Sequence, residues 1–333
     1  MRQASSQNTL LSCEAVGAVD WIVMISYSEV QQFRRCQRQW FFKNVCANAL
    51  AKKDPLRREA YVLSKLQSLS AWRGSLVDRV ISTYLLPELR KRSLPSLDSL
   101  LREARRLFDI QRAFATAHRV REGGMKVSSN PDAFAALLDV ELGNTPDGAA
   151  FDLAWNDVET SLRNALGMQE LFADLRSANV IVQPRLFFDI NDVKVAASPD
   201  VIAFRRNRTI RIVDWKVHSF GLRAAKSQLT VYACALHRGQ PQSYFAWDPK
   251  GTPLSQFEST EVQLINGEIH DYSVNEQDVD EMLDDLFESG ELIELACGDK
   301  SEDDMRADEF PVTNWPEMCP RCGFRRICKE GAS

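Results

Sequence analysis

Three short runs of β-branched and apolar residues follow one another between residues 179 and 217, separated by turn residues. Their sequences are NVIVQPRLFFDI, VKVAASPDVIAF and TIRIVDWKV, and this composition predicts three adjacent strands. A helix over 223–237, a fourth strand at SYFAW (243–247) and a hairpin that turns at Asn266-Gly267 are expected to follow. This segment therefore predicts a small mixed sheet with a helix packed against it.

Helical patterns dominate the chain before this segment. Residues 29–45 carry an apolar stripe at helical spacing after a candidate N-cap, Ser28, and long helices are predicted within 57–122 and 151–175. The expected fold class is α/β: a small mixed sheet with flanking helices, a helical N-terminal lobe and a cysteine-containing C-terminal tail. We expect four segments: a loose leader (1–23), the helical lobe (24–178), the sheet segment with its hairpin (179–275), and an acidic helix with the tail (276–333).

Composition limits the classes of protein to which the chain can belong. Apolar residues make up 44% and charged residues 26%, an ordinary globular balance that excludes collagen-like and wholly disordered chains. No window offers the roughly 18 uninterrupted apolar residues of a membrane span, and the N-terminus lacks the pattern of a secretory signal. We therefore expect a cytoplasmic location and no membrane partner.

The net charge of −5 hides an uneven distribution of charge. Residues 276–309 hold fifteen acidic and two basic side chains, which leaves 39 basic against 31 acidic residues in the rest of the chain. Any one basic cluster is most often a solvated surface, but four of them favour a track for a phosphate backbone. The clusters are Arg34, Arg35, Arg38 and Lys43; Lys52, Lys53, Arg57 and Arg58; Arg205, Arg206, Arg208 and Arg211; and Arg321, Arg325 and Arg326.

Two acidic motifs lie in the predicted sheet. Thirteen residues separate Pro199-Asp200 from Asp214-Trp215-Lys216. Asp214 and Lys216 are two residues apart on a strand and so share a face, and Asp200 on a paired strand would join them. A lone D-x-K is usually a surface ion pair. With a second carboxylate and apolar flanks, it predicts a site where a hard divalent cation activates water and Lys216 orients that water or stabilises charge.

Gln228 and Tyr232 follow on the predicted helix, four residues apart and therefore on one face. Alone, such a pair is usually a polar helix flank; beside the carboxylates it could position a phosphate or a water molecule. In this order and spacing, the PD, D-x-K and Q-x-x-x-Y motifs resemble the PD-(D/E)XK nuclease superfamily. They are more narrowly similar to its RecB-like exonucleases, which include the AddB nuclease and the CRISPR-associated iron–sulfur nucleases.

The resemblance covers about residues 26–330 and implies a restriction-endonuclease-like core within one intertwined domain, residues 24–330. It implies catalytic roles for five residues and a metal-binding role for the backbone carbonyl of Trp215. The five are Asp200, Asp214, Lys216, Gln228 and Tyr232.

The chain departs from the family pattern at two informative positions. Asp78 stands where the family commonly has a metal-binding His, and Gln183 stands where it often has a Glu. Aspartate is also a ligand for hard cations. The resemblance therefore implies an active enzyme in which Asp78 helps Asp200 and Asp214 to hold Mg²⁺ or Mn²⁺.

Three cysteines, Cys319, Cys322 and Cys328, cluster near the C-terminus, and a fourth ligand must come from elsewhere. By spacing alone, zinc is the commoner occupant of a C-x-x-C motif, and the ferredoxin run C-x-x-C-x-x-C is absent. The family resemblance instead implies a [4Fe–4S] cluster with Cys36 as the fourth thiolate. Such a cluster would join the N-terminal helix to the tail and couple its own binding to folding.

The resemblance thus implies a metal-dependent DNA nuclease acting on single-stranded or flapped ends, in repair, recombination or anti-phage defence. The sequence has no G-x-x-x-x-G-K-[ST] motif of its own, so a helicase would be a separate partner. The alternative is a catalytically weak or inactive DNA-binding subunit of a larger complex, stabilised by a cluster or by zinc. The departures at Asp78 and Gln183 keep this alternative open.

Overall fold

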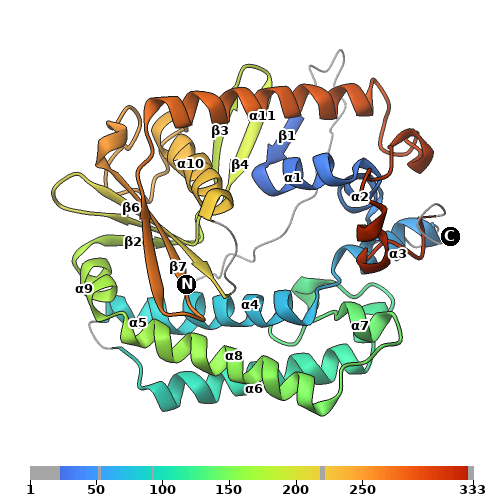
Figure 1. Cartoon of the computed structure of the whole chain (residues 1–333), viewed down its shortest axis with the longest axis horizontal. Helices are drawn as coiled ribbons and strands as arrows, with labels where there is room; N and C mark the ends of the chain where they lie inside the picture. The colour runs from blue at the N-terminus through green and yellow to red at the C-terminus, as the bar shows by residue number, and fades with distance from the viewer. Residues whose placement is uncertain (1–22, 52–53, 92–93, 218–221, 329–333) are drawn as a thin grey trace.

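The computed structural model describes residues 23–51, 54–91, 94–217 and 222–328. Nearly all of the expected leader, and two residues of the basic clusters, Lys52 and Lys53, lie outside these ranges. Within them, the strands form two mixed sheets (Figure 1). The smaller has the order β1 (Val23–Ser26), β4 (Val193–Ala197) and β3 (Leu186–Ile190), and the larger has the order β2 (Asn179–Val182), β5 (Val201–Phe204), β6 (Ile210–Lys216), β7 (Phe257–Gln263) and β8 (Glu268–Tyr272).

The strand predictions need three corrections. The runs NVIVQPRLFFDI and VKVAASPDVIAF are not single strands, because residues 183–185 separate β2 from β3 and Ser198-Pro199-Asp200 separates β4 from β5. In each case the two strands belong to different sheets. Each break contains a proline, which has no N–H to donate to a ladder. SYFAW forms turns instead of a strand. Its Phe245 and Trp247 pack against Phe204 without strand pairing, whereas the hairpin at Asn266-Gly267 is present between β7 and β8.

Helix α10 (Leu222–Arg238) lies between the two sheets and contacts β3 and β4 on one side and β6 and β7 on the other. It forms the crossover from β6 to β7, which therefore pair in parallel. Alternate residues of β5 and β6 face opposite cores. Ile210 and Ile212 join the core around α10, while Val213 and Trp215 join the core of the helical lobe. The central strand of the larger sheet is thus buried on both faces.

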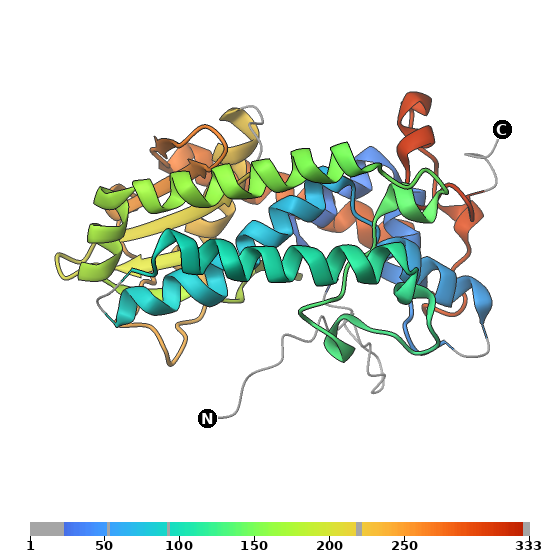
Figure 2. The ribbon, with the colours of Figure 1, turned by 90° about the horizontal axis from the view of Figure 1, so that it is seen from below.

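The helical lobe packs against the other face of this sheet. Its long helices α4 (Leu69–Val80), α6 (Leu97–Thr116) and α8 (Gly148–Gly167) lie side by side (Figure 2). Pro87 lies in the first turn of α5 (Leu86–Arg90), where a missing backbone N–H is tolerated. The predicted helix 151–175 is in fact α8 and α9 (Gln169–Ser177), with Met168 between them. The lobe also holds α3 (Pro55–Ser64), η2 (Ile81–Leu85), η3 (Arg119–Arg121), η4 (Val127–Ser129) and α7 (Leu138–Glu141).

The first helix, α1 (Tyr27–Arg35), is capped by Ser26 and not by Ser28. The Ser26 hydroxyl accepts from the Glu29 N–H at 3.3 Å, and the Glu29 carboxylate accepts from the Ser26 N–H at 2.7 Å. This reciprocal capping box satisfies two backbone donors at once, which Ser28 could not do inside the first turn. The helical path is interrupted at Cys36, resumes as α2 (Gln37–Phe41) and ends in a π-helical turn, η1 (Phe42–Cys46).

The acidic segment forms α11 (Glu276–Cys297), which crosses the whole molecule and contacts α1, β1, β4 and α10 (Figure 1). Short helical turns occupy part of the remaining C-terminal half. They are η5 (Leu254–Gln256), η6 (Ala307–Glu309) and η7 (Pro316–Arg321). None of the helices in the described ranges has the length and apolar content to span a bilayer.

Candidate nuclease site

The end of β6 brings the predicted acidic motifs together. Asp214 and Lys216 project from the same face toward α10, and the Lys216 Nζ lies 2.6 Å from Asp214 Oδ2. Pairing between β5 and β6 stops at Val213, so the Trp215 N–H is free to donate to Asp200 Oδ2, at 2.8 Å. Asp200 therefore stands beside β6 just before β5 begins.

Gln228 and Tyr232 complete a closed ring of hydrogen bonds with the lysine and the carboxylate. Lys216 Nζ donates to Gln228 Oε1 at 3.0 Å, and Gln228 Nε2 donates to the Tyr232 hydroxyl at 2.5 Å. The Tyr232 hydroxyl is directed at Asp214 Oδ1 at a longer 3.5 Å. The spacing of four residues on α10 makes this ring possible, because both side chains face β6.

Asp78 enters the site from α4 in the helical lobe. Its Oδ2 accepts from Gln183 Nε2 at 2.9 Å, while its Oδ1 is buried with no hydrogen-bond partner among the described residues. Gln183 has φ of 47°, a left-handed conformation that is costly for a side chain other than glycine. Its backbone N–H also donates to the Asp200 carbonyl at 2.8 Å. The two positions at which the chain departs from the family pattern thus contact each other.

Burial and mutual repulsion raise the pKa values of all three carboxyl groups. The pKa of Asp200 is raised well above its ordinary value, first by burial and then by Asp214 and Asp78. Burial likewise raises the pKa of Asp214 against the opposing effect of Lys216, and burial raises that of Asp78. The pKa of the Tyr232 phenol is also raised strongly by burial, so this group stays protonated at neutral pH. The site holds more negative charge than its lysine can balance.

Sequence reasoning missed a fourth carboxylate, Glu261 on β7. It pairs in register with Asp214, is 2% exposed and contributes to the raised pKa of Asp214. The Tyr272 hydroxyl on β8 donates to its Oε2 at 2.8 Å. An acidic residue inside the strand FESTEVQ was a usable signal, but its register with β6 could not be derived from the sequence.

The oxygen atoms of this site are of the kind that a hard divalent cation prefers, because such ions bind carboxylate oxygens. One oxygen of Asp78 has no hydrogen-bond partner among the described residues. The raised pKa values of the three aspartates indicate that their negative charge is not fully balanced. The N–H and C=O of one strand residue point to the same side, so the Trp215 carbonyl is directed to the side where Asp200 lies. In the described part of the chain, however, no three His, Cys, Asp or Glu side chains are arranged to hold one metal ion together.

The four predicted cluster cysteines line one small cavity. Among the described residues, their thiols are not arranged to hold one metal ion. Cys36, Cys319, Cys322 and Cys328 surround a space of about 20 Å³, shared with Phe324. Cys36 is the N-cap of α2, and its sulfur accepts from the Gln39 N–H at 3.4 Å. Burial, together with the three neighbouring thiols, raises the pKa of Cys322 to about 11. The interruption of the helix at Cys36 and the fold of the tail therefore bring these thiols together.

Several residues of the basic clusters pair with carboxylates of the same chain, so these residues are not free to bind phosphate. Arg34 pairs with Asp285 on α11 at 2.6 Å, and Arg57 pairs with Glu302 and Asp303. The acidic segment thus neutralises basic residues of the same chain.

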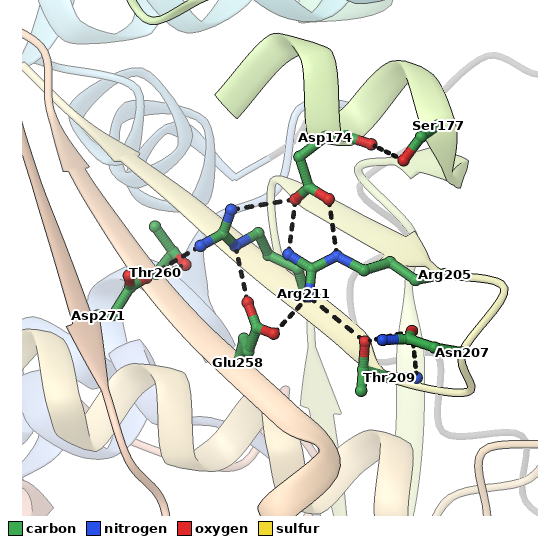
Figure 3. A network of polar contacts seen from close by, with 9 residues as sticks. All are labelled: Asp174, Ser177, Arg205, Asn207, Thr209, Arg211, Glu258, Thr260 and Asp271. Atoms are coloured by element: carbon green, nitrogen blue, oxygen red, sulfur yellow. Dashed lines mark hydrogen bonds and ion pairs between the residues drawn. The ribbon is translucent and has the colours of Figure 1, made fainter. Parts of the chain in front are cut away.

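The arginines of the sheet are similarly occupied (Figure 3). Arg205 and Arg211 both bind Asp174 on α9, with Arg205 bidentate at 2.6 and 2.8 Å, and both pair with Glu258 on β7. Such charge-assisted, partly buried pairs hold a helix of the lobe against the sheet. These ion pairs therefore fix α9 on the larger sheet.

A comparison with protein families agrees with this arrangement. The family model of the PD-(D/E)XK nuclease superfamily matches residues 24–329, and the chain belongs to this superfamily. Its mixed α/β architecture is consistent with a restriction-endonuclease-like fold. Eight chains of solved structures match. One, described as the crystal structure of SSO0001, is 13% identical over 67% of this chain and 86% of that chain, with a TM-score of 0.29. No curated protein matches.

Proposed function

We propose that the chain is a metal-dependent deoxyribonuclease that hydrolyses phosphodiester bonds. The observation that carries this proposal is the cluster of three carboxylates, buried Asp214 and partly buried Asp78 and Asp200, beside Lys216 in a chain of this superfamily. Three clustered carboxylates with raised pKa values are costly in a purely structural role. A divalent cation would remove that cost.

Asp200, Asp214 and Asp78, with the Trp215 carbonyl, would hold Mg²⁺ or Mn²⁺. Such an ion lowers the pKa of water and offsets the charge of a phosphodiester. Lys216 has three N–H donors; Asp214 and Gln228 engage two, and the third is left for the attacking water or a phosphate oxygen. The protonated Tyr232 serves as a hydrogen-bond donor and not as a base, and Gln228 holds Lys216 and Tyr232 in place.

We assign the enzyme to the RecB-like, iron–sulfur subtype. Four thiols from two distant segments share one cavity with Phe324, which stacks on Phe42 at 5.8 Å. A [4Fe–4S] cluster would be held by Cys36, Cys319, Cys322 and Cys328, and zinc is the alternative occupant. The Arg38 side chain also donates to the Phe310 carbonyl at 2.8 Å. These contacts, with the pairing of β1 and β4, support one intertwined domain over residues 24–330.

The substrate we propose is DNA with a single-stranded or flapped end, in repair, recombination or defence. A helicase that delivers the strand is the partner we propose, as the resemblance to the RecB-like exonucleases implies. We place the enzyme in the cytoplasm, where clustered thiols stay reduced.

The test is a cleavage assay on anaerobically purified protein with Mg²⁺ or Mn²⁺. Labelled single-stranded, duplex and flapped DNA, and single-stranded RNA, are compared for the wild type, Asp214→Asn and the matched control Asp189→Asn, an exposed carboxylate on β3. We expect cleavage of DNA by the wild type and the control, and a loss of at least about a hundredfold in Asp214→Asn. Cleavage that survives both Asp200→Ala and Asp214→Ala would show that the site is misassigned. A wild type that binds DNA without cutting it would support the inactive DNA-binding subunit.

A further inference from the structure

A second cavity, of about 290 Å³, lies apart from the carboxylate site. Its wall is built by α1 and α2, by the end of α3 and by Gly323-Phe324 of the cysteine tail. Polar and basic side chains dominate this wall. They are Ser28, Gln32, Arg35, Gln39, Lys43 and Ser64.

The cations of this cavity differ from those of the neutralised clusters. In the part of the chain that the structure describes, neither Arg35 nor Lys43 forms an ion pair with a carboxylate. Glu29 is the acidic group that acts on Lys43, and its carboxylate is already engaged with the Ser26 backbone. The pKa of Lys43 is lowered, chiefly because protein displaces water around its ammonium and further because Arg35 is close. The pKa of Lys65 is also lowered, chiefly by burial and further by Lys43. Positive charge is therefore concentrated here without a direct ion pair to a carboxylate of the described residues.

An unsatisfied polar group lies in the same wall. Gln32 is 5% exposed, and its side-chain carbonyl oxygen has no hydrogen-bond partner among the described residues. A buried carboxamide without a partner is unfavourable, and such groups in native proteins usually have a ligand or water to satisfy them. Unpaired cations and an unsatisfied carboxamide together favour an occupant that is anionic and rich in hydrogen-bond acceptors.

Helix α4 connects the cavity to the carboxylate site. Leu66, which lines the cavity, precedes α4 by three residues, and Asp78 lies on the last turns of α4. In Figure 1, α4 runs from the region of α3 toward the larger sheet. At about 1.5 Å per residue, Leu69 and Asp78 are about 14 Å apart along the helix axis. An anion in the cavity would thus be held about two or more nucleotides from the cleaved bond.

We propose that this cavity is a phosphate-binding subsite for a single nucleic-acid strand, with Arg35 and Lys43 binding a phosphodiester and Gln32 hydrogen bonding to it. The subsite holds the strand remote from the reacting phosphate, and the proposal rests on a nucleic acid being the substrate. Because Gly323-Phe324 close the cavity next to Cys322, the subsite is assembled only when the tail is folded against α1 and α2.

The test measures binding in EDTA, so it does not depend on cleavage. The affinity of the full-length protein for fluorescein-labelled (dT)15 is measured by anisotropy over a range of salt concentrations. The double variant Arg35→Gln, Lys43→Gln is compared with Arg206→Gln, Lys250→Gln, which removes two exposed charges near the starts of β6 and β7, away from the carboxylates. We expect weaker binding only in the first variant. Its slope of log K against log salt should fall by about 0.7 for each lost phosphate contact.

A third variant, Gln32→Met, separates a binding role from a structural one. Removal of an unsatisfied buried carboxamide should leave the melting temperature equal or higher, whereas a subsite role requires weaker (dT)15 binding. Two outcomes would overturn the proposal. One is equal weakening of (dT)15 binding by both double variants. The other is unchanged (dT)15 binding in both Gln32→Met and the Arg35→Gln, Lys43→Gln variant. The same variants are tested with a fluorescent ATP analogue. Loss of ATP binding with unchanged (dT)15 affinity would show a free-nucleotide site and would also overturn it.

Absence of cleavage in the wild type would remove the proposed nuclease activity without affecting this result. Conversely, if the wild type cleaves DNA but these substitutions do not change the affinity for (dT)15, the proposed function stands and the proposed subsite is wrong.

Discussion

The buried carboxylate Glu261 offers a sharp test of the electrostatic argument, through the substitution Glu261→Gln. Glu261 and Asp214 are register partners on parallel strands, and neighbouring strands lie about 4.8 Å apart. Two carboxylates about 5 Å apart repel each other by about 3 kcal/mol at an effective dielectric constant of 20. Lys216 offsets part of this repulsion, and glutamine still accepts the hydrogen bond from Tyr272. We therefore expect the free energy of unfolding without metal to rise by about 1–2 kcal/mol.

The pH dependence of this gain has a definite sign. Asp78, Asp200 and Asp214 have raised pKa values in the folded state, so above the ordinary aspartate pKa of about 4 the folded protein binds more protons than the unfolded chain. Stability without metal therefore falls as the pH rises through the raised values. Loss of the Glu261 charge lowers the pKa of Asp214 and makes this fall shallower. The stability difference between variant and wild type should grow with pH and vanish near pH 4.

Urea unfolding in EDTA at several pH values measures this difference, with Glu268→Gln on β8 as the control. Glu268 is exposed, so its substitution should change the free energy of unfolding by less than about 0.5 kcal/mol. Calorimetric titration with Mg²⁺ should show the opposite sign, with weaker binding in Glu261→Gln because negative charge has been removed. A variant that is less stable than the wild type at pH 8, or whose gain does not depend on pH, would refute the reasoning.

Three further predictions address the rest of the site and its support. Asp78→Ala should lose most cleavage activity and Asp78→His should keep some, while both bind (dT)15 normally in EDTA; an alanine variant with full activity would exclude Asp78 from the metal site. Cys36→Ser should lose the broad visible absorbance of anaerobically purified protein and reduce its solubility, whereas Cys46→Ser should do neither; a colourless wild type with stoichiometric zinc would favour zinc over iron. Arg205→Met should lower the free energy of unfolding by about 1–3 kcal/mol, because Asp174 loses its bidentate partner, with little change in cleavage by the folded protein at low temperature; unaltered urea unfolding would mean that this network contributes no stability.

The sequence by itself determined the parts of the site that depend on local geometry. A strand places Asp214 and Lys216 on one face, and a helix places Gln228 and Tyr232 on one face, because side-chain direction repeats every two and every 3.6 residues. The same local rules indicated the hairpin at Asn266-Gly267. They failed where a local pattern was ambiguous, as at SYFAW, whose aromatic residues pack on Phe204 from a turn.

Only the tertiary structure decided which distant residues meet. The register of β6 with β7 puts Glu261 beside Asp214, and the contact of α4 with the loop after β2 pairs Asp78 with Gln183. Charge provides the clearest contrast, because Arg205 and Arg35 both belong to basic clusters in the sequence. Asp174 and Glu258 neutralise Arg205, while Arg35 faces a polar cavity without a carboxylate partner among the described residues. The energy of a charge depends on the groups that folding brings within a few ångströms of it, and periodicity along the chain does not specify those groups.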